Sequence, residues 1–308
     1  MSGERPILIA GPTAGGKSAL AARLARELGG IVINADSMQV YRDLRILSAR
    51  PSPAEEEAVP HALYGFVSGS DAYSAGRYAA DAARAIADAR AKGLRPILVG
   101  GTGLYFKALL DGLSPMPSVP EDVRAYWRGE AAAAGPGELH GKLSARDPVM
   151  AERLAPGDTQ RIVRALEVLD ASGISLLEWQ QVPREPVLEA AETVRLVVSP
   201  AREELYRRID QRFEAMASSG AVEEVARLAE LDLDPALPLM RALGVRPLLR
   251  YVRGEIEKND AIAAGQTETR QYAKRQLTWA RGNMITWKWL TEKETKIDEG
   301  NFINFIDR

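Results

Sequence analysis

The segment Gly11–Ser18, which reads GPTAGGKS, constrains the fold of this 308-residue chain more than any other feature. It has the G-x-x-x-x-G-K-S spacing of a phosphate-binding P-loop. The short apolar run Ile7–Ala10 precedes it, as a buried strand would. Apolar residues follow at the spacing of one helix face, namely Leu20, Leu24 and Leu28. The segment therefore predicts a strand, a glycine loop and a helix in succession.

This loop is also the first candidate binding site. Its members are Gly11, Pro12, Thr13, Ala14, Gly15, Gly16, Lys17 and Ser18. Glycines let backbone N–H groups turn inward around phosphate oxygens, and the start of the helix adds positive potential. Lys17 supplies a charge, and Ser18 is placed to hold Mg²⁺. The loop alone does not distinguish a diphosphate from a triphosphate, and the alternative is an ordinary glycine turn before a helix.

Further strand and helix patterns extend this opening unit. Residues 31–33, 96–99 and 194–198 read as strands, and an alanine-rich helix is expected over 78–92. Alternating strands and helices indicate an α/β fold with a P-loop NTPase-like parallel sheet.

Proline-rich connectors interrupt this α/β pattern. They contain Pro115, Pro117, Pro120, Pro183 and Pro186. The sequence between these connectors has a helical pattern, so we expect a helical insertion over 113–191 within a core formed by 1–112 and 192–308. Within the core, residues 203–289 read as helices.

Composition narrows the kinds of catalytic site, metal site and partner that the chain can have. The chain has no cysteine and two histidines, which excludes thiolate catalysis, disulfides and Cys-based zinc or iron–sulfur sites. Net charge is −2, yet residues 241–289 carry ten Lys and Arg against four Asp and Glu, which permits a phosphate-rich partner. No apolar stretch is long enough for a membrane span or signal peptide, so a cytoplasmic protein is expected, and we expect a monomer.

Polar residues at the carboxyl edge of the predicted sheet are further candidates. Asp36 follows the second strand, where a carboxylate can accept a proton or reach a Mg²⁺ shell. Thr13 and Thr102 lie in loops at the same edge, the latter in the glycine-rich segment 100–103. Each of these residues can also be an ordinary turn or cap residue.

Basic helices form the last group of candidates. In the insertion, Gln160, Arg161, Ile162, Val163 and Arg164 share a helix whose apolar stripe includes Ile162. Near the end of the core, Arg270, Lys274 and Arg275 lie on another helix. Like charges on one face gain little from each other and suit phosphate contacts, although a solvated surface is the alternative.

Together, GPTAGGKS, ADSMQVY (35–41) and VGGTGLY (99–105) closely resemble the tRNA dimethylallyltransferase family. The segments DPVMAERLAPGDTQRIVRALEV (147–168), RRIDQRF (207–213) and TRQYAKRQLTWARG (269–282) resemble it as well. The resemblance runs in order from about residue 7 to 289. Some members carry a C-terminal zinc finger, which a chain without cysteine does not have.

The resemblance implies transfer of a dimethylallyl group from its diphosphate to the exocyclic amine of the adenosine 3′ of the tRNA anticodon. The P-loop then holds the diphosphate with Mg²⁺. Asp36 corresponds to the general base, Thr13 to a residue at the reaction centre, and Arg212 to a residue of the substrate channel. The resemblance implies tRNA contacts, with the anticodon stem-loop, for Asp36, Ser37, Met38, Gln39, Thr102, Arg124, and 160–164.

Three other functions remain open at this point. An adenylate prenyltransferase acts on a free nucleotide, and the helical insertion and basic helix argue against it. A P-loop small-molecule kinase uses ATP with Asp36 as base. A P-loop RNA-binding or switch protein only senses a nucleotide and does not depend on Asp36 for its activity.

Overall fold

The computed structural model describes residues 5–295, so the ends of the predicted core, 1–4 and 296–308, lie outside the described residues. The chain divides into two compact units, one running up to Leu110 and resuming at Val187, and the other spanning Asp111–Pro186. Both boundaries fall slightly earlier than the expected 113 and 191. The late boundary moves because the amides of Val187 and Leu188 donate to Leu109 O, at 2.8 and 3.0 Å, and so join the first unit.

The first unit is built on a six-stranded parallel sheet with the order β3-β2-β4-β1-β5-β6. Its strands are β1 (Ile7–Ala10), β2 (Gly30–Asn34), β3 (His61–Ala62), β4 (Arg95–Gly100), β5 (Val194–Val198) and β6 (Lys288–Leu290). β1 lies between β4 and β5, with Ile7 opposite both Ile97 and Val194. Every residue of β1 is buried, as expected for a parallel strand covered on both faces.

The α/β fold class is confirmed, and strands are present at all four predicted positions. Two short edge strands were not predicted. The expectation of helices throughout 203–289 is wrong at its end, because β6 begins at Lys288. Strands of two or three residues are too short to show alternation, so no sequence period marks them.

Helices cover both faces of this sheet. One face packs on α1 (Lys17–Glu27) through Leu20 and Leu24. The other face packs on α3 (Ala75–Ala91), α4 (Gly103–Leu110) and α13 (Lys258–Asn283), whose buried residues share a core with Leu8 and Leu98. The alternation of Ile7 and Leu8 between these two cores follows from the two-residue period of a strand.

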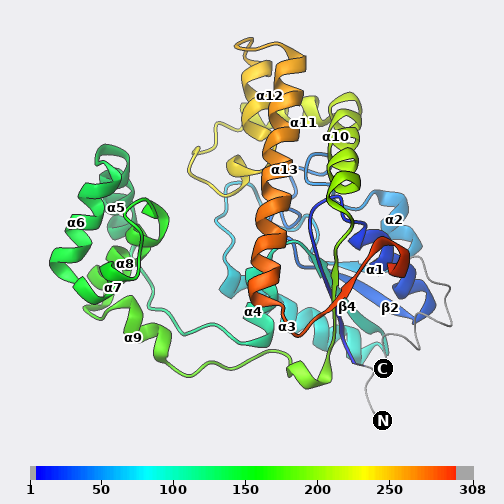
Figure 1. Cartoon of the computed structure of the whole chain (residues 1–308), viewed down its shortest axis with the longest axis horizontal. Coiled ribbons are helices and arrows are strands. Elements are labelled where there is room, and N and C mark those ends of the chain that lie inside the picture. Colours follow the sequence, from blue (N-terminus) through cyan, green and yellow to red (C-terminus); the bar gives the residue numbers. More distant parts are fainter. Residues whose placement is uncertain (1–4, 296–308) are drawn as a thin grey trace. The chain divides into compact units, whose positions relative to one another are not determined.

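The remaining helices of this unit precede or flank α13. They are α2 (Pro53–Ala58), α10 (Arg202–Ser218), α11 (Ala221–Glu230), α12 (Val245–Val252), α14 (Glu292–Thr295) and the 3₁₀ turns Ala190–Glu192 and Leu239–Arg241. Figure 1 shows α13, in orange, beside α10 and α12, both of which contact it. This arrangement carries α10 and α13 to the loops that follow β1 and β4.

The regular secondary structure described in the second unit is all helical. It contains α5 (Glu121–Ala133), α6 (Pro136–Arg146), α7 (Pro148–Glu152), α8 (Thr159–Ser172) and α9 (Leu176–Gln181). Asp147, Asp158 and Ser175 cap α7, α8 and α9 by accepting backbone N–H bonds. Trp127, Leu143 and other apolar residues form a core of this unit's own.

Between residues 5 and 295, no helix combines the length and apolarity needed to cross a bilayer.

Candidate active site

The P-loop between β1 and α1 is closed by its own backbone. Pro12 O accepts from Gly15 N at 3.1 Å and from Lys17 Nζ at 2.7 Å. The lysine side chain therefore folds back over the loop, and its charge lies at the pocket that the loop forms. Ser18 follows in the first turn of α1 and lines the same pocket.

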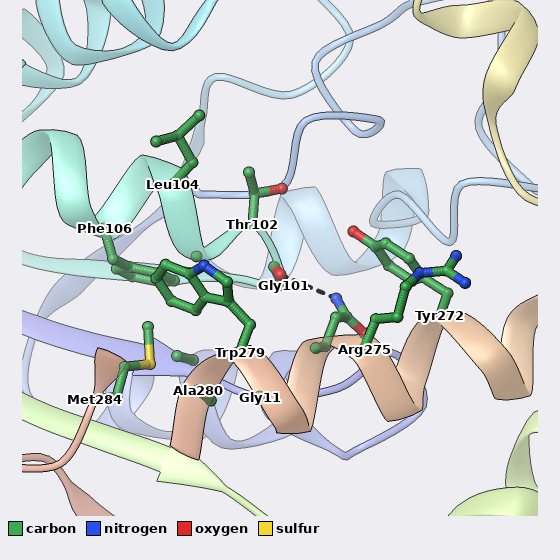
Figure 2. Close-up of a pocket in the computed structure, with 13 residues that line it drawn as sticks. Gly11, Gly101, Thr102, Leu104, Phe106, Tyr272, Arg275, Trp279, Ala280 and Met284 are labelled. Atoms are coloured by element: carbon green, nitrogen blue, oxygen red, sulfur yellow. Dashed lines mark hydrogen bonds between the residues drawn. The ribbon is translucent and has the colours of Figure 1, made fainter. Parts of the chain in front are cut away.

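Thr13 is held from two sides by helices distant in sequence. Its hydroxyl accepts from Arg212 Nη2 on α10, and its amide donates to Gln276 Oε1 on α13 at 2.8 Å. The same Gln276 donates through Nε2 to Gly101 O, in the loop after β4, at 3.0 Å (dashed line in Figure 2). The resemblance assigned Thr13 to the reaction centre and Arg212 to the substrate channel, and the structure brings the two side chains into contact.

Asp36 lies in a tight turn at the end of β2. Asn34, fully buried, accepts from Asp36 N at 2.8 Å through Oδ1 and donates to Asp36 O at 2.9 Å through Nδ2. Asp36 Oδ1 accepts from Met38 N at 3.0 Å. A Cβ placed on Gly101 would lie 3.2 Å from Asp36 Oδ2, so this second oxygen is directed toward the glycine loop. The turn orients one carboxylate oxygen while the other faces the site.

Thr102 and Gln39 connect the loops around this turn. Thr102 Oγ1 accepts from Ser37 N at 2.9 Å and donates to Ser37 Oγ at 3.2 Å. Gln39 Nε2 donates to the carbonyl oxygens of Ser48 and Ala49, at 3.0 and 3.1 Å. Both side chains thus shape the site through bonds within the protein. For Thr102 this is the role of an ordinary turn residue, the alternative that the sequence left open.

A polar pocket of about 540 Å³ is formed where the P-loop, Asp36 and α10 meet. Its lining includes Gln39, Ser48, Arg208, Gln211 and Arg212 in addition to the P-loop residues. Burial lowers the pKa of Lys17 to about 8, while the charge of Asp36 opposes this change and that of Arg212 adds to it. Burial also lowers the pKa of Arg212, and Asp36 again opposes the change. A pocket with these cations and one carboxylate suits an anionic ligand that brings its own charge.

A second pocket of about 300 Å³ lies against the glycine loop and is mostly apolar. Figure 2 shows its lining residues, among them Leu104, Phe106, Trp279 and Met284. Trp279 comes from α13 and packs on the first turn of α4, where Gly103 leaves room for its ring. Because this pocket reaches Gly11 and Gly101 while the polar pocket reaches Thr13 and Gly100, the two pockets adjoin along the same two loops.

The three basic residues predicted on α13 differ in whether other parts of the protein engage their charge. Arg270 pairs with Asp210 of α10 and also donates to Thr267 Oγ1 at 2.9 Å. Lys274 and Arg275 are exposed, and the Arg275 guanidinium lies 5.6 Å from the Tyr272 ring centre. Lys274 and Arg275 can therefore reach a partner, whereas Arg270 is engaged within the protein.

The predicted positions of the insertion lie in the second unit. Arg161, three-quarters exposed, pairs with Asp158, and Arg164 pairs with Glu167. Arg124 on α5 pairs with Glu121 at 3.9 Å. Gln160 is exposed and Val163 half-buried, whereas Ile162 is fully buried in the core of this unit. The ion pairs here join residues three positions apart in the chain, a weak type of interaction that leaves the cations accessible.

Three site residues were missed by sequence reasoning. Arg208 lies one helical turn before Arg212 and lines the same pocket, a spacing that could have identified it. Gln276 and Trp279 stand within a segment used for the family resemblance, three residues apart on one face of α13. No local pattern distinguishes their contacts with Thr13 and Gly103, because those partners are far away in the chain.

Comparison with known proteins gives consistent matches. Residues 39–283 match the IPP transferase family, and residues 5–63 match the isopentenyl transferase family. A tRNA dimethylallyltransferase of Parvibaculum lavamentivorans is 49% identical over 98% of this chain and 96% of its own length. One from Azorhizobium caulinodans is 55% identical over 91% of this chain and 90% of its own.

Solved structures agree with the sequence matches. A tRNA isopentenylpyrophosphate transferase of Bacillus halodurans superposes with a TM-score of 0.68 at 30% identity, covering 99% of this chain and 95% of that one. A eukaryotic dimethylallyltransferase acting on tRNA superposes with a TM-score of 0.76 at 28% identity, covering 94% of this chain and 74% of that one.

Proposed function

The chain belongs to the IPP transferase family, and we propose that it transfers a dimethylallyl group from dimethylallyl diphosphate to tRNA. The acceptor is the exocyclic amine of the adenosine 3′ of the anticodon. The relatives named above, about half identical over nearly their whole length, support this reaction.

One observation carries the chemical part of the proposal. A carboxylate, three cations and a P-loop line one pocket, and an apolar pocket adjoins it along the same loops. The diphosphate is held by the P-loop, Lys17 and Arg212, and the apolar dimethylallyl group is held against Trp279 and Phe106. The reacting carbon then lies where the two pockets meet, near Thr13 and Asp36.

The reaction is a substitution at this carbon. The adenine amine nitrogen forms a bond to it, and the bond to the diphosphate oxygen breaks with its electron pair leaving on the diphosphate. Lys17 and Arg212 stabilise the charge that develops on the leaving group. The amine loses a proton to the Asp36 carboxylate, whose orientation is set by Asn34 and the Met38 amide.

The polar pocket offers oxygen donors, the type of ligand that Mg²⁺ prefers. The ion is commonly held by one or two protein oxygens together with substrate phosphates and water, and Ser18 offers a hydroxyl beside the P-loop. We propose Ser18 as its protein ligand. When bound, Mg²⁺ neutralises charge on the diphosphate.

A tRNA loop suits this site, because the adenine must leave its stack to approach Asp36. The exposed cations Lys274 and Arg275 of α13, together with exposed Arg161 and half-buried Arg164 of α8, are proposed to contact phosphates of the anticodon stem-loop.

A transfer assay tests the reaction. Purified protein receives radiolabelled dimethylallyl diphosphate and Mg²⁺, without ATP, and either unmodified tRNA or AMP. Label in tRNA alone supports the proposal. Label in AMP alone would indicate an adenylate prenyltransferase, and phosphoryl transfer from ATP to a small molecule would indicate a kinase.

The Asp36→Asn variant tests the base. Its kcat is expected to fall by about 10² to 10⁴-fold, the usual contribution of a general base. The matched control is Asp71→Asn, which removes a carboxylate paired with Arg77 away from the pocket and is expected to leave kcat within twofold. A kcat of Asp36→Asn equal to that of the control would remove Asp36 as base.

A further inference from the structure

Gln276 is the residue that joins the two loops of the site. Its side-chain oxygen accepts from Thr13 N at 2.8 Å, and its side-chain nitrogen donates to Gly101 O at 3.0 Å. Both ends of one amide are therefore engaged, one on the P-loop and one on the loop after β4. A primary amide offers a donor and an acceptor in one plane, which is what this pair of partners requires.

We propose that Gln276 is a positioning residue that sets the spacing between the leaving group and the base. The inference rests on the proposed function, because it assigns the two loops to those roles. The P-loop side carries Thr13 and the diphosphate pocket, and the Gly101 side lies against Asp36 Oδ2.

Gly101 shows how closely these groups approach. A Cβ at this position would overlap Gln276 Nε2 and lie 3.2 Å from Asp36 Oδ2. The amide of Gln276 and the free oxygen of Asp36 therefore flank the same point on the backbone. A shift of the glycine loop relative to the P-loop would move the base relative to the diphosphate, and a displacement of about 1 Å can cost about 10²-fold in rate.

Several contacts besides those of Gln276 hold α13 in place. Trp279 packs on Gly103, Phe213 packs on Gly265, and Arg270 pairs with Asp210. Gln266 donates to Asp210 O at 3.1 Å, also from α13. Loss of the Gln276 amide therefore releases the two loops without releasing the helix, and Gln266 is a matched control of the same residue type on the same helix.

Steady-state kinetics with an anticodon stem-loop RNA separate positioning from binding. Gln276→Ala is expected to lower kcat by about 30 to 100-fold while the KM values for RNA and dimethylallyl diphosphate change less than threefold. Gln266→Ala is expected to leave kcat within twofold. A kcat of Gln276→Ala within threefold of the Gln266→Ala value would overturn the inference, as would a loss confined to KM.

The Gln276→Glu variant gives a readout that a general packing defect does not move. A protonated carboxyl keeps one acceptor and one donor and so replaces the amide, whereas an ionised carboxylate has no donor for Gly101 O. The ratio of its kcat to that of the unchanged protein is expected to rise at least tenfold from pH 8 to pH 5.5. A ratio that stays constant over this range would contradict the donor role of Nε2.

Amide exchange tests the bridge without any transfer reaction. In Gln276→Ala the Thr13 amide proton is expected to exchange with solvent at least tenfold faster than in Gln266→Ala, measured by NMR. An equal rate would overturn the bridge. Absence of transfer by the unchanged protein would instead refute the proposed function, and the exchange rates would still decide whether Gln276 holds the two loops together.

Discussion

The protonation of Lys17 is expected to control capture of dimethylallyl diphosphate. Burial lowers its pKa from 10.5 to about 8. In this folded protein the lysine binds fewer protons than in the unfolded chain between about pH 8 and 10.5, so stability should rise with pH across that window. Conversely, keeping the buried charge at pH 7 costs about 3 kcal/mol, at 1.36 kcal/mol for each pKa unit between 10.5 and about 8.

We expect a bound diphosphate to supply negative charge and to raise the pKa of Lys17 again. The kcat/KM for dimethylallyl diphosphate reports the free protein, so it should fall about tenfold for each pH unit above pH 8. The kcat reports the bound state and should stay level to higher pH. Asp36 raises the pKa of Lys17, so in Asp36→Asn the fall should begin at lower pH.

The assay is the initial rate of label transfer to a saturating stem-loop RNA from pH 6.5 to 9.5. Lys17→Arg is the control, because arginine does not titrate in this range and its profile should lose the fall above pH 8. A profile of kcat/KM that stays flat to pH 9.5, or a fall that moves to higher pH in Asp36→Asn, would refute this account.

Three further expectations concern loop support, packing and RNA binding. Glu224 accepts from the amides of Arg45, Ile46 and Leu47, so Glu224→Gln should lower the free energy of unfolding by about 1–3 kcal/mol. The same change should raise the KM for dimethylallyl diphosphate, because the pocket residues Ser48 and Ala49 follow in the same loop. An unchanged urea midpoint would contradict this expectation. Gly103→Ala should lower the free energy of unfolding in urea by about 1–3 kcal/mol, because the added methyl group overlaps the Trp279 ring. Gly282→Ala is the control, because Gly282 has open space around it and the change should not destabilise the protein. Equal urea midpoints for the two variants would refute the packing argument. Arg161→Ala combined with Arg164→Ala should weaken tRNA binding and reduce its salt dependence by about one to two ions, measured by filter binding from 50 to 300 mM salt; an unaltered slope would assign both residues to a solvated face.

The sequence predicted the parts of the site that are local. Residues 7–18 encode a strand, a glycine loop and the start of a helix within one continuous segment, so their pattern was sufficient to predict this local structure. The turn at Asp36 was also local, because Asn34 and Met38 are its immediate neighbours. These features need no knowledge of the tertiary structure.

Contacts between distant segments were not predictable in the same way. The Arg270 charge is paired with Asp210 on another helix, and a count of basic residues does not show such pairing. The bond from Thr13 to Gln276 spans 263 residues, and no period or spacing indicates it. The apolar pocket likewise depends on Trp279 meeting Gly103, which only the packing of α13 brings about.

The interruption of the first unit by the second has a consequence for biosynthesis. On the ribosome, β1 and β4 emerge before the second unit, but β5, the other neighbour of β1, emerges only after it. The second unit is continuous in sequence and can bury its own core around Trp127 while the sheet is still unfinished. Gln276 emerges later still, so the P-loop is translated 263 residues ahead of the α13 residue that accepts from Thr13 N. A nascent chain that stops before α13 carries the P-loop without the helix that joins it to the glycine loop.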